Sequence, residues 1–532
     1  TAKKTAKKKG RRHRRLSLRG QIRAEEKLAA AHRDVFLELA RIQAARGAYG
    51  AAVRHAEEAL ALARGAQIEA RVALLEVVNN LYYVGDYRRV LSLADEGLAL
   101  SGRSPRRRLQ FLNAKGVTLS RMGQAEPALV ALREALKLAR GTHRLGEIAA
   151  SHNNIGDALR TAGRFEEARV AFAEALRLDR GRGNSVGRSF DLANLGLTDA
   201  LLGLRARARQ ELNEAKALAQ EIGAPLNRLK ALAGLARLDL AANRLAKARD
   251  HAAVGLALSR RLGLRTWLWR FLLLSGHAAR AEGKLDLALR HFKEGVAIVD
   301  ALPPRALLAA GMPKIQGQPS DLDDELIELL ARRGQAEASF VLAERARLRR
   351  LVDRVSRNVS RLPEAAARQE LAALVSLAAD VEALRGARLR AKTAKARQGI
   401  DRELEAIEGR REARRRKLAA LNPRLVSLVE AHAAPLAALR RALPAKTALV
   451  AFYPGPRGVI TWVLDPQGLK VHVADLPRPQ LVTLVQHFRE ALTTFQPVKR
   501  PARRLYDLLL GTLAPALRGR SQLVVVSSGI LL

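Results

Sequence analysis

The feature that most constrains this sequence is a turn residue that returns about every 40 positions between two helix-forming stretches. Six of the seven turn residues are glycine and one is asparagine, the next-best residue at a positive φ. They are Gly47, Gly85, Gly123, Gly163, Gly203, Asn243 and Gly283, with spacings of 38, 38, 40, 40, 40 and 40 residues. A fixed period of this size predicts a solenoid, in which each helix pair buries its apolar stripe against its neighbours.

The stretch 152–178 shows the repeating unit most completely. Small residues stand where two helix backbones must come close, and large apolar residues stand between them. The small residues are Gly156, Ala168 and Ala175, and the large ones are Ile155, Leu159, Phe165 and Phe172. This pattern resembles tetratricopeptide repeats, in the longer variety of roughly 40 residues. A weaker eighth copy turns at Gly334.

The repeats define the domain plan of the 532-residue chain. We expect a mainly α fold, with a tetratricopeptide-repeat α-solenoid followed by a helical hairpin and the N-terminal part of an α/β domain. The expected ranges are 1–22 for a disordered basic tail, 23–300 for seven repeats, 301–352 for a connector and the degenerate eighth repeat, 364–441 for a charged helical hairpin and 442–532 for the α/β part.

In the α/β part the apolar period changes from 3.6 to 2. Alternating residues bounded by turn residues predict an antiparallel meander of three strands, at 448–453, 459–464 and 469–473. Two helices are predicted next, at 479–493 and 501–517, and a buried strand at 522–526.

The charge of the chain limits its function classes. There are 94 Lys and Arg residues against 52 Asp and Glu, a net charge of +42, and ten of the basic residues lie in the first 19 positions. That segment has the composition of a disordered tail able to make non-specific contact with nucleic acid or an anionic surface. The remaining arginine is spread over helix surfaces, without a base-reading helix or an aromatic stacking platform.

The sequence contains no cysteine, which excludes a disulfide, a thiolate metal site and a cysteine nucleophile within these residues. We predict no cofactor and no metal site. No run of 18 uncharged apolar residues is present, so no membrane span is predicted. The N-terminus lacks the apolar segment of a signal peptide, and the expected location is the cytoplasm.

The first helix of each repeat is expected to line the concave side of the solenoid. Exposed polar side chains there would suit a protein or peptide partner, although a solvated face without a ligand explains any single one of them equally well. The candidate partner-binding residues are Asn79, Asn113, Arg121, Asn153, Asp157, Arg160, Arg237, His277 and Arg280.

Several short motifs follow the repeats in order. They are Asn422-Pro423, then Leu443-Pro444 with Thr447-Ala448-Leu449-Val450, then Leu505-Tyr506, then the apolar run 523–526 followed by Gly529 and Leu531. This series resembles the beginning of a CHAT domain, the caspase-like domain that accompanies tetratricopeptide repeats. Ser527 and Ser528 stand where that family has Pro and Asp.

The resemblance implies a cysteine peptidase with a His–Cys dyad, in which the histidine activates a thiolate nucleophile. In the family both residues follow the strand at 522–526, so the sequence ends before them and we predict no catalytic residue here. We therefore interpret the chain as the protein-interaction and regulatory part of a repeat-controlled caspase-like peptidase, itself inactive. The alternatives are a non-enzymatic repeat scaffold with a remnant domain and a basic nucleic-acid-associated helical protein.

Overall fold

The computed structural model describes residues 18–45, 49–63, 67–84, 86–102, 104–300, 319–358, 393–422 and 436–527, and parts of 366–377. The chain forms two compact units, Thr1–Gly187 and Arg188–Leu532. Several predicted features lie outside the described residues. They are residues 1–17 of the tail, the turns at Gly47 and Gly85, the connector at 301–318, residues 378–392 and 424–435 of the charged hairpin, and Ser528 to Leu531.

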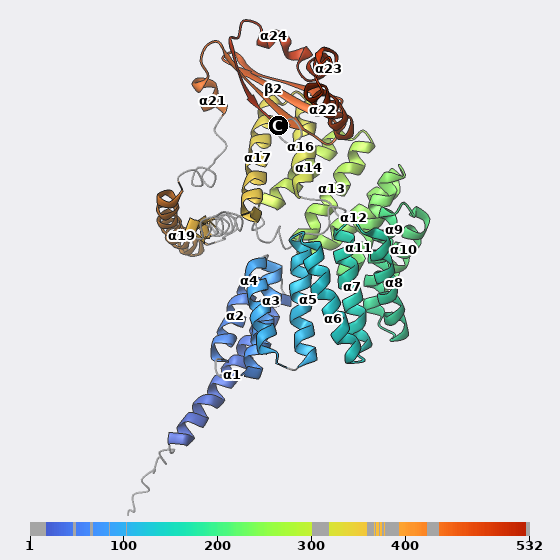
Figure 1. The fold of residues 1–532 in the computed structure, drawn as a ribbon, viewed down its shortest axis with the longest axis vertical. Helices are drawn as coiled ribbons and strands as arrows, with labels where there is room; N and C mark the ends of the chain where they lie inside the picture. The colour runs from blue at the N-terminus through green and yellow to red at the C-terminus, as the bar shows by residue number, and fades with distance from the viewer. Residues whose placement is uncertain are drawn as a thin grey trace, which may run out of the picture. The chain divides into compact units, whose positions relative to one another are not determined.

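The first unit consists of helices that pair in sequence order (Figure 1). They are α1 (Leu18–Ala45), α2 (Tyr49–Leu62), α3 (Gln67–Val84), α4 (Tyr87–Leu100), α5 (Pro105–Arg121), α6 (Ala125–Gly141), α7 (Leu145–Thr161) and α8 (Phe165–Gly181). Each helix packs on the next, and the first helices α1, α3, α5 and α7 also contact one another. Helix α1 begins at Leu18, so the predicted tail of 1–22 was too long. Leu18 and Ile22 already follow the helical apolar spacing.

The turns within the helix pairs have the predicted left-handed backbone. The angle φ is 77° at Gly123, 80° at Gly163 and 52° at Asn243. The turns between the pairs use the same conformation, for example at Gly183 and Gly223, where φ is 67°. From α5 to α13 the chain therefore alternates 17-residue helices with three-residue turns, a finer period than the sequence predicted.

Glycines inside the helices mark positions where an aromatic ring lies against the neighbouring backbone. A Cβ atom added to Gly156 would lie 2.7 Å from the ring of Phe172, and one added to Gly255 would lie 2.1 Å from the ring of Phe271. Both distances are shorter than a carbon–carbon contact allows. The small residues of the repeat therefore allow the close helix packing that the sequence predicted.

The second unit continues the helix pairs and adds a sheet. Its helix pairs are α9 (Ser185–Leu201), which begins in the first unit, with α10 (Arg205–Glu221); α11 (Pro225–Ala241) with α12 (Leu245–Arg261); α13 (Arg265–Ala281) with α14 (Leu285–Asp300); and α16 (Pro319–Arg332) with α17 (Ala336–Asn358). The pair α16–α17 is the predicted eighth copy, and φ is 72° at its turn residue Gly334. Helix α16 packs against both α13 and α14.

The sheet contains β1 (Thr447–Pro454), β2 (Val459–Asp465), β3 (Gly468–Ala474) and β4 (Gln522–Val526), in the order β3-β2-β1-β4. The first three strands form the predicted antiparallel meander, and β4 pairs with β1 in parallel, with Ala448 opposite Leu523. Helices α22 (Arg478–Thr493), α23 (Lys499–Leu509) and α24 (Ala514–Leu517) follow the meander, with the short 3-10 helix η3 (Gly511–Leu513) between the last two.

The sheet lies between two helical layers (Figure 1). On one face the hydrophobic core runs without interruption from the seventh and eighth helix pairs to β1 and β2. There the ring of Trp462 meets Phe340 of α17 edge-on, at 5.8 Å between ring centroids, and its Nε1 donates to Ser339 Oγ at 3.0 Å. On the other face α22, α23 and α24 cover two further clusters. The eighth repeat therefore also serves as a layer of the α/β domain.

The prediction that strand 522–526 is buried was wrong for this chain. Leu523, Val524 and Val525 are each about half exposed. Among the described residues β4 has a single neighbour, β1, and so forms an edge of the sheet. An apolar run alone does not distinguish an edge strand from a central one.

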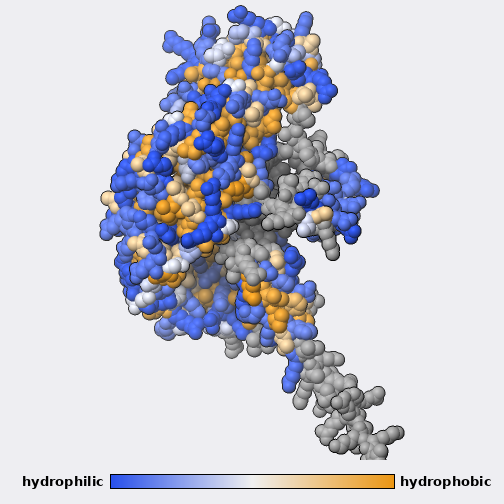
Figure 2. All heavy atoms as spheres, turned by 180° about the vertical axis from the view of Figure 1, so that it is seen from behind, coloured by the Kyte–Doolittle hydropathy of each residue, from blue (hydrophilic) through white to orange (hydrophobic). Residues whose placement is uncertain are grey.

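Two helices of the predicted charged hairpin region are described. They are α19 (Ala394–Leu421) and α21 (Leu436–Ala442). Arg414 of α19 donates to Glu370 at 2.9 Å, which joins α19 to the segment 366–377 as an antiparallel hairpin would. On the face that Figure 2 shows, hydrophilic side chains are interspersed with apolar ones.

Candidate functional site

The most unusual helix of this basic chain is α16, which is acidic. Its 14 residues contain five carboxylates, at Asp321, Asp323, Asp324, Glu325 and Glu328. Burying an unpaired carboxylate is strongly unfavourable, so such a helix needs cationic partners on every side. The partners come from α13, from α17 and from the loop between β1 and β2. Helix α16 is therefore the point where the repeats and the sheet meet.

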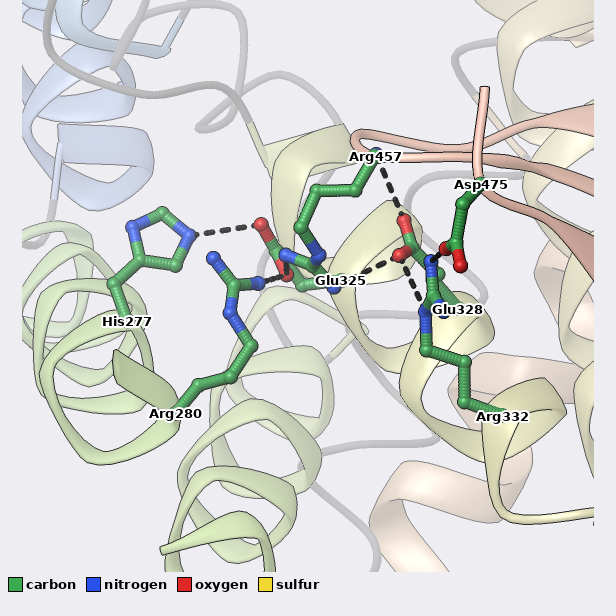
Figure 3. Close-up of polar contacts among 7 residues, drawn as sticks. All are labelled: His277, Arg280, Glu325, Glu328, Arg332, Arg457 and Asp475. Atoms are coloured by element: carbon green, nitrogen blue, oxygen red, sulfur yellow. Dashed lines mark hydrogen bonds and ion pairs between the residues drawn. The ribbon is translucent and has the colours of Figure 1, made fainter. Parts of the chain in front are cut away.

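Glu325 joins the seventh repeat to the sheet (Figure 3). Its side chain is 6% exposed. One oxygen, Oε1, lies 3.1 Å from Nε2 of His277, and the other, Oε2, accepts from Arg280, also on α13. Oε2 also accepts from Arg457 Nη1 at 3.0 Å, and Arg457 lies in the β1–β2 loop. The carboxylate of Glu325 thus bonds both to the seventh repeat and to the β1–β2 loop of the sheet.

Glu328, one turn further along α16, holds the same loop from the other side. Its side chain is fully buried. It accepts from the backbone N–H of Arg457 at 3.0 Å and from Arg332 Nε at 2.9 Å. Arg332 also donates to Asp475 at the end of β3, at 2.7 Å. A Cβ atom on Gly455 would lie 2.9 Å from Glu328 Oε2, so the loop approaches α16 as closely as a glycine permits.

Helix α17 contributes a second polar contact with the sheet. Tyr453 of β1 donates to Asp324 Oδ1 at 2.6 Å, and Arg350 donates to the hydroxyl of Tyr453 at 2.7 Å. Arg347 donates to the carbonyl oxygen of Phe452 at 2.6 Å. Burial raises the pKa of Asp324, while Arg350 and Tyr453 act in the opposite direction. The sheet is therefore fixed to both helices of the eighth pair.

The electrostatics of this junction favour a neutral imidazole at His277. Burial, together with the nearby positive charges of Arg457 and Arg237, lowers its pKa to about 4, although Asp321 acts in the opposite direction. A neutral ring can donate from Nε2 to the ionised Glu325. Burial also lowers the pKa of Arg237 to about 10, which Asp321 opposes. The predicted residues Arg237, His277 and Arg280 thus all face the acidic helix.

The predicted site residues of the first unit form a separate polar row. Arg121 Nε donates to the hydroxyl of Tyr82 at 2.8 Å, and its Nη2 lies 3.9 Å from Asp157. Asp157 also accepts from Arg160, its neighbour one turn away. A second contact joins α5 and α7, where Asn154 of α7 donates to Asn113 of α5 at 3.2 Å. These contacts link α3, α5 and α7.

Two of the predicted residues are not exposed as expected. Asn153 is 8% exposed and Arg160 is 3% exposed, with the guanidinium of Arg160 over the ring of Phe172. Both residues lie where α7 packs against its neighbours, because α7 contacts α5 and α6 as well as its own partner helix α8. Asn79, in contrast, is exposed on α3.

Sequence reasoning missed the partners that complete both groups. They are Tyr82 and Asn154 in the first unit, and Asp324, Glu325, Glu328, Arg332, Tyr453, Arg457 and Asp475 in the second. One signal was available, since five acids in 14 residues stand out in a chain of net charge +42. Nothing in the sequence indicated that the loop containing Arg457 would meet this helix.

One part of the chain is similar to a known repeat family. The profile of the tetratricopeptide repeat family matches residues 107–181. Similar solved structures include BtubC (BKLC) from P. vanneervenii, at 17% identity over 41% of this chain and 90% of that one, with a TM-score of 0.36. A Rap protein complexed with competence and sporulation factor has 13% identity over 61% of this chain and 98% of that one, with a TM-score of 0.41.

The apo form of the quorum sensor NprR from B. thuringiensis has 11% identity over 74% of this chain and all of that one, with a TM-score of 0.39. No curated protein sequence matches this chain. The profile match and the consecutive helix pairs define the class: a repeat protein with a tetratricopeptide-like helical solenoid and a small mixed sheet.

Among the residues that the structure describes, no three His, Asp or Glu side chains are grouped so that they could hold a metal ion. None of the described helices combines the length and the apolar character that crossing a bilayer requires.

Proposed function

We propose that this chain binds a protein or peptide through the first helices of its repeats and transmits that binding to its C-terminal sheet. In this proposal it is the regulatory part of a repeat-controlled caspase-like protein of the CHAT type. The observation that carries the proposal is Glu325, whose carboxylate bonds to His277 and Arg280 of the seventh repeat and to Arg457 of the β1–β2 loop.

Two physical features support transmission through this point. The hydrophobic core is continuous from Trp269 and Phe292 of the seventh pair to Tyr453 and Trp462 of the sheet, and packed cores transmit strain. The ionic groups on α16 have low exposure, so a shift of α13 that separates Arg280 from Glu325 leaves a buried carboxylate short of a partner. The sheet would then respond to a movement of the repeats.

The CHAT part of the proposal is supported by the motifs in the sequence between Asn422 and Leu531. Its test is the coding region that follows Leu532. A histidine and a cysteine at the ends of two further strands support a peptidase, and an immediate stop codon contradicts it. A recombinant protein of these 532 residues should cleave no protein substrate, because it contains no cysteine nucleophile.

The binding part is tested with peptides selected from a displayed random library on the full 532-residue chain. Hydrogen exchange is then compared with and without the selected peptide. A peptide that binds the first-helix layer should change the protection of α13 and also that of the β1–β2 loop. The variant Glu325→Gln should bind the same peptide and lose the change in the loop.

A matched control is the exposed ion pair of Arg333 and Asp286, at 2.6 Å on the same helix hairpins. Arg333→Gln should leave both peptide binding and transmission intact. A peptide that binds the layer without altering the loop in the native chain contradicts transmission and favours a scaffold that only holds its partner.

A further inference from the structure

The corner between α22 and α23 has an unusual residue at its turn. Helix α22 ends at Thr493, and the N–H of Gln496 donates back to the carbonyl oxygen of Ala491 at 2.9 Å. This bond closes a helix C-terminus in which one residue must be left-handed. That residue is Phe495, where φ is 54°.

The same bond closes many other helices of this chain, which provides an internal comparison. In those helices the left-handed residue is glycine or asparagine, as backbone sterics prefer, while the turn after α6 has His143 with a φ of 55°. The positions are Gly123, Gly163, Gly183, Gly203, Gly223, Asn243, Gly263, Gly283 and Gly334. A phenylalanine at this position is disfavoured by the backbone, so the fold of the corner does not explain it.

Packing of the side chain inside the fold does not explain Phe495 either. Its side chain is 97% exposed, the highest value among the exposed large apolar residues of the described chain. Leu492, one turn before it, is 49% exposed. The aromatic ring therefore gains almost nothing from packing within the fold, although large apolar rings are normally at least partly buried.

Cationic side chains follow the turn on α23. Helix α23 begins with Lys499 and Arg500 and continues with Arg503 and Arg504, all exposed. No acidic residue occupies its first turn, where the helix dipole favours anions and disfavours cations. Arg503 pairs with Asp507 at 3.1 Å. Two local preferences, for the backbone at the turn and for charge at the helix start, are thus violated at one corner.

We propose that this corner binds an anionic membrane surface, with Phe495 and Leu492 entering the interfacial layer and the four cations facing lipid phosphates. An isolated ring on a convex turn suits a bilayer, which needs no preformed complementary pocket, whereas a protein partner would have to supply the whole pocket. Basic residues beside an apolar anchor are the combination that anionic leaflets attract.

The test measures how the full chain partitions onto vesicles of phosphatidylcholine with a minor fraction of phosphatidylserine. Phe495→Gly should lower the partition coefficient about fivefold, a part of the transfer free energy of a fully buried ring. Glycine fits the left-handed turn, so this variant should melt at the same temperature as the native chain or above it. Loss of binding therefore cannot result from unfolding.

The contribution of the basic residues and the insertion depth of residue 495 are tested with separate variants. Replacing Lys499 and Arg500 by glutamine should lower binding to the anionic vesicles by about 25-fold, since each basic residue near the surface contributes a factor of about five. In Phe495→Trp the new indole should be quenched by brominated lipid. The three native tryptophans are buried and should not be quenched by this lipid.

The control for an exposed apolar side chain elsewhere is Val170→Ala, because Val170 is 69% exposed on α8. It should bind vesicles as the native chain does. Equal partition of Phe495→Gly and the native chain overturns the proposal, as does an unquenched Trp at position 495. A Phe495-dependent complex with an acidic protein, with vesicle binding unchanged by Phe495→Gly, also overturns it.

Discussion

Replacing Glu325 by glutamine should loosen two regions that are far apart in the sequence. The substitution keeps the size of the side chain and removes the charge that His277, Arg280 and Arg457 share. Without that charge the two guanidinium groups repel each other across the position. We expect α13 and the β1–β2 loop to open more often, and to do so together.

The size of the effect follows from burial. Breaking a buried ion pair costs about 3–5 kcal/mol when the remaining charge stays dry. Here the side chains of Arg280 and Arg457 are 25% and 34% exposed, so water can solvate part of each charge. We therefore expect a loss of about 2–3 kcal/mol in local stability.

Hydrogen exchange is the suitable assay, because the chain forms two units and its global unfolding need not be two-state. The opening free energies of amides in α13, α16 and β1–β2 are compared between the native chain and Glu325→Gln. Arg333→Gln serves as the control and should cost at most about 1 kcal/mol, as exposed pairs do.

Two results would refute the reasoning. Faster exchange confined to α16 would mean that Glu325 stabilises only its own helix. A double-mutant cycle between Arg280→Ala and Arg457→Ala gives the second result. Strictly additive effects would show that the two arginines do not act through one carboxylate.

The remaining predictions concern pH and packing. The pKa of His277 is about 4 in the fold and its ordinary value is about 6.5, so the unfolded chain takes up the proton first. The stability that neutral His277 provides is then complete above about pH 6.5 and falls by about 3 kcal/mol as the pH drops to about 4. Unfolding curves of His277→Gln should lack that part of the pH dependence, and identical pH profiles would contradict it. Gly255→Ala should cost about 1–3 kcal/mol because its methyl group meets the ring of Phe271, and Phe271→Leu should recover part of this loss. Gly263→Ala should cost about 1–2 kcal/mol through its backbone alone, since φ is 66° and its surroundings are open. Phe271→Leu should not rescue Gly263→Ala. The melting temperatures of Gly255→Ala and Gly263→Ala, each alone and combined with Phe271→Leu, measure both effects.

Local sequence rules predicted the elements of this fold well. Turn glycines, helix periodicity and alternating strands depend on neighbours within a few residues, and positions such as Gly163 and Gly334 carry that information by themselves. The prediction of β4 as a buried strand was wrong, since Val524 and Val525 do not reveal whether a further strand lies beside them.

The sequence named only some of the residues that the structure brings together at α16. Arg237, His277 and Arg280 were named from a local pattern on the inner side of first helices, and their role in binding a partner stays a prediction. Glu325, which contacts His277 and Arg280, lies 45 residues beyond Arg280, and Arg457 lies 132 residues beyond Glu325. Contacts at such separations depend on how the last helix pair meets the sheet, which no short-range pattern records.

The shared role of α16 and α17 limits how this architecture can be modified. Among the described residues, the main contacts of the helix pairs before α11 are with neighbouring repeat helices, so pairs could be inserted or removed there. The eighth pair differs, because Ser339, Phe340 and Arg350 on α17 hold the sheet directly. A chimera that exchanges the repeat array should therefore place its joint in the connector before Pro319 and retain α16 and α17 with the sheet. A joint placed after α17 would remove one layer of the α/β domain.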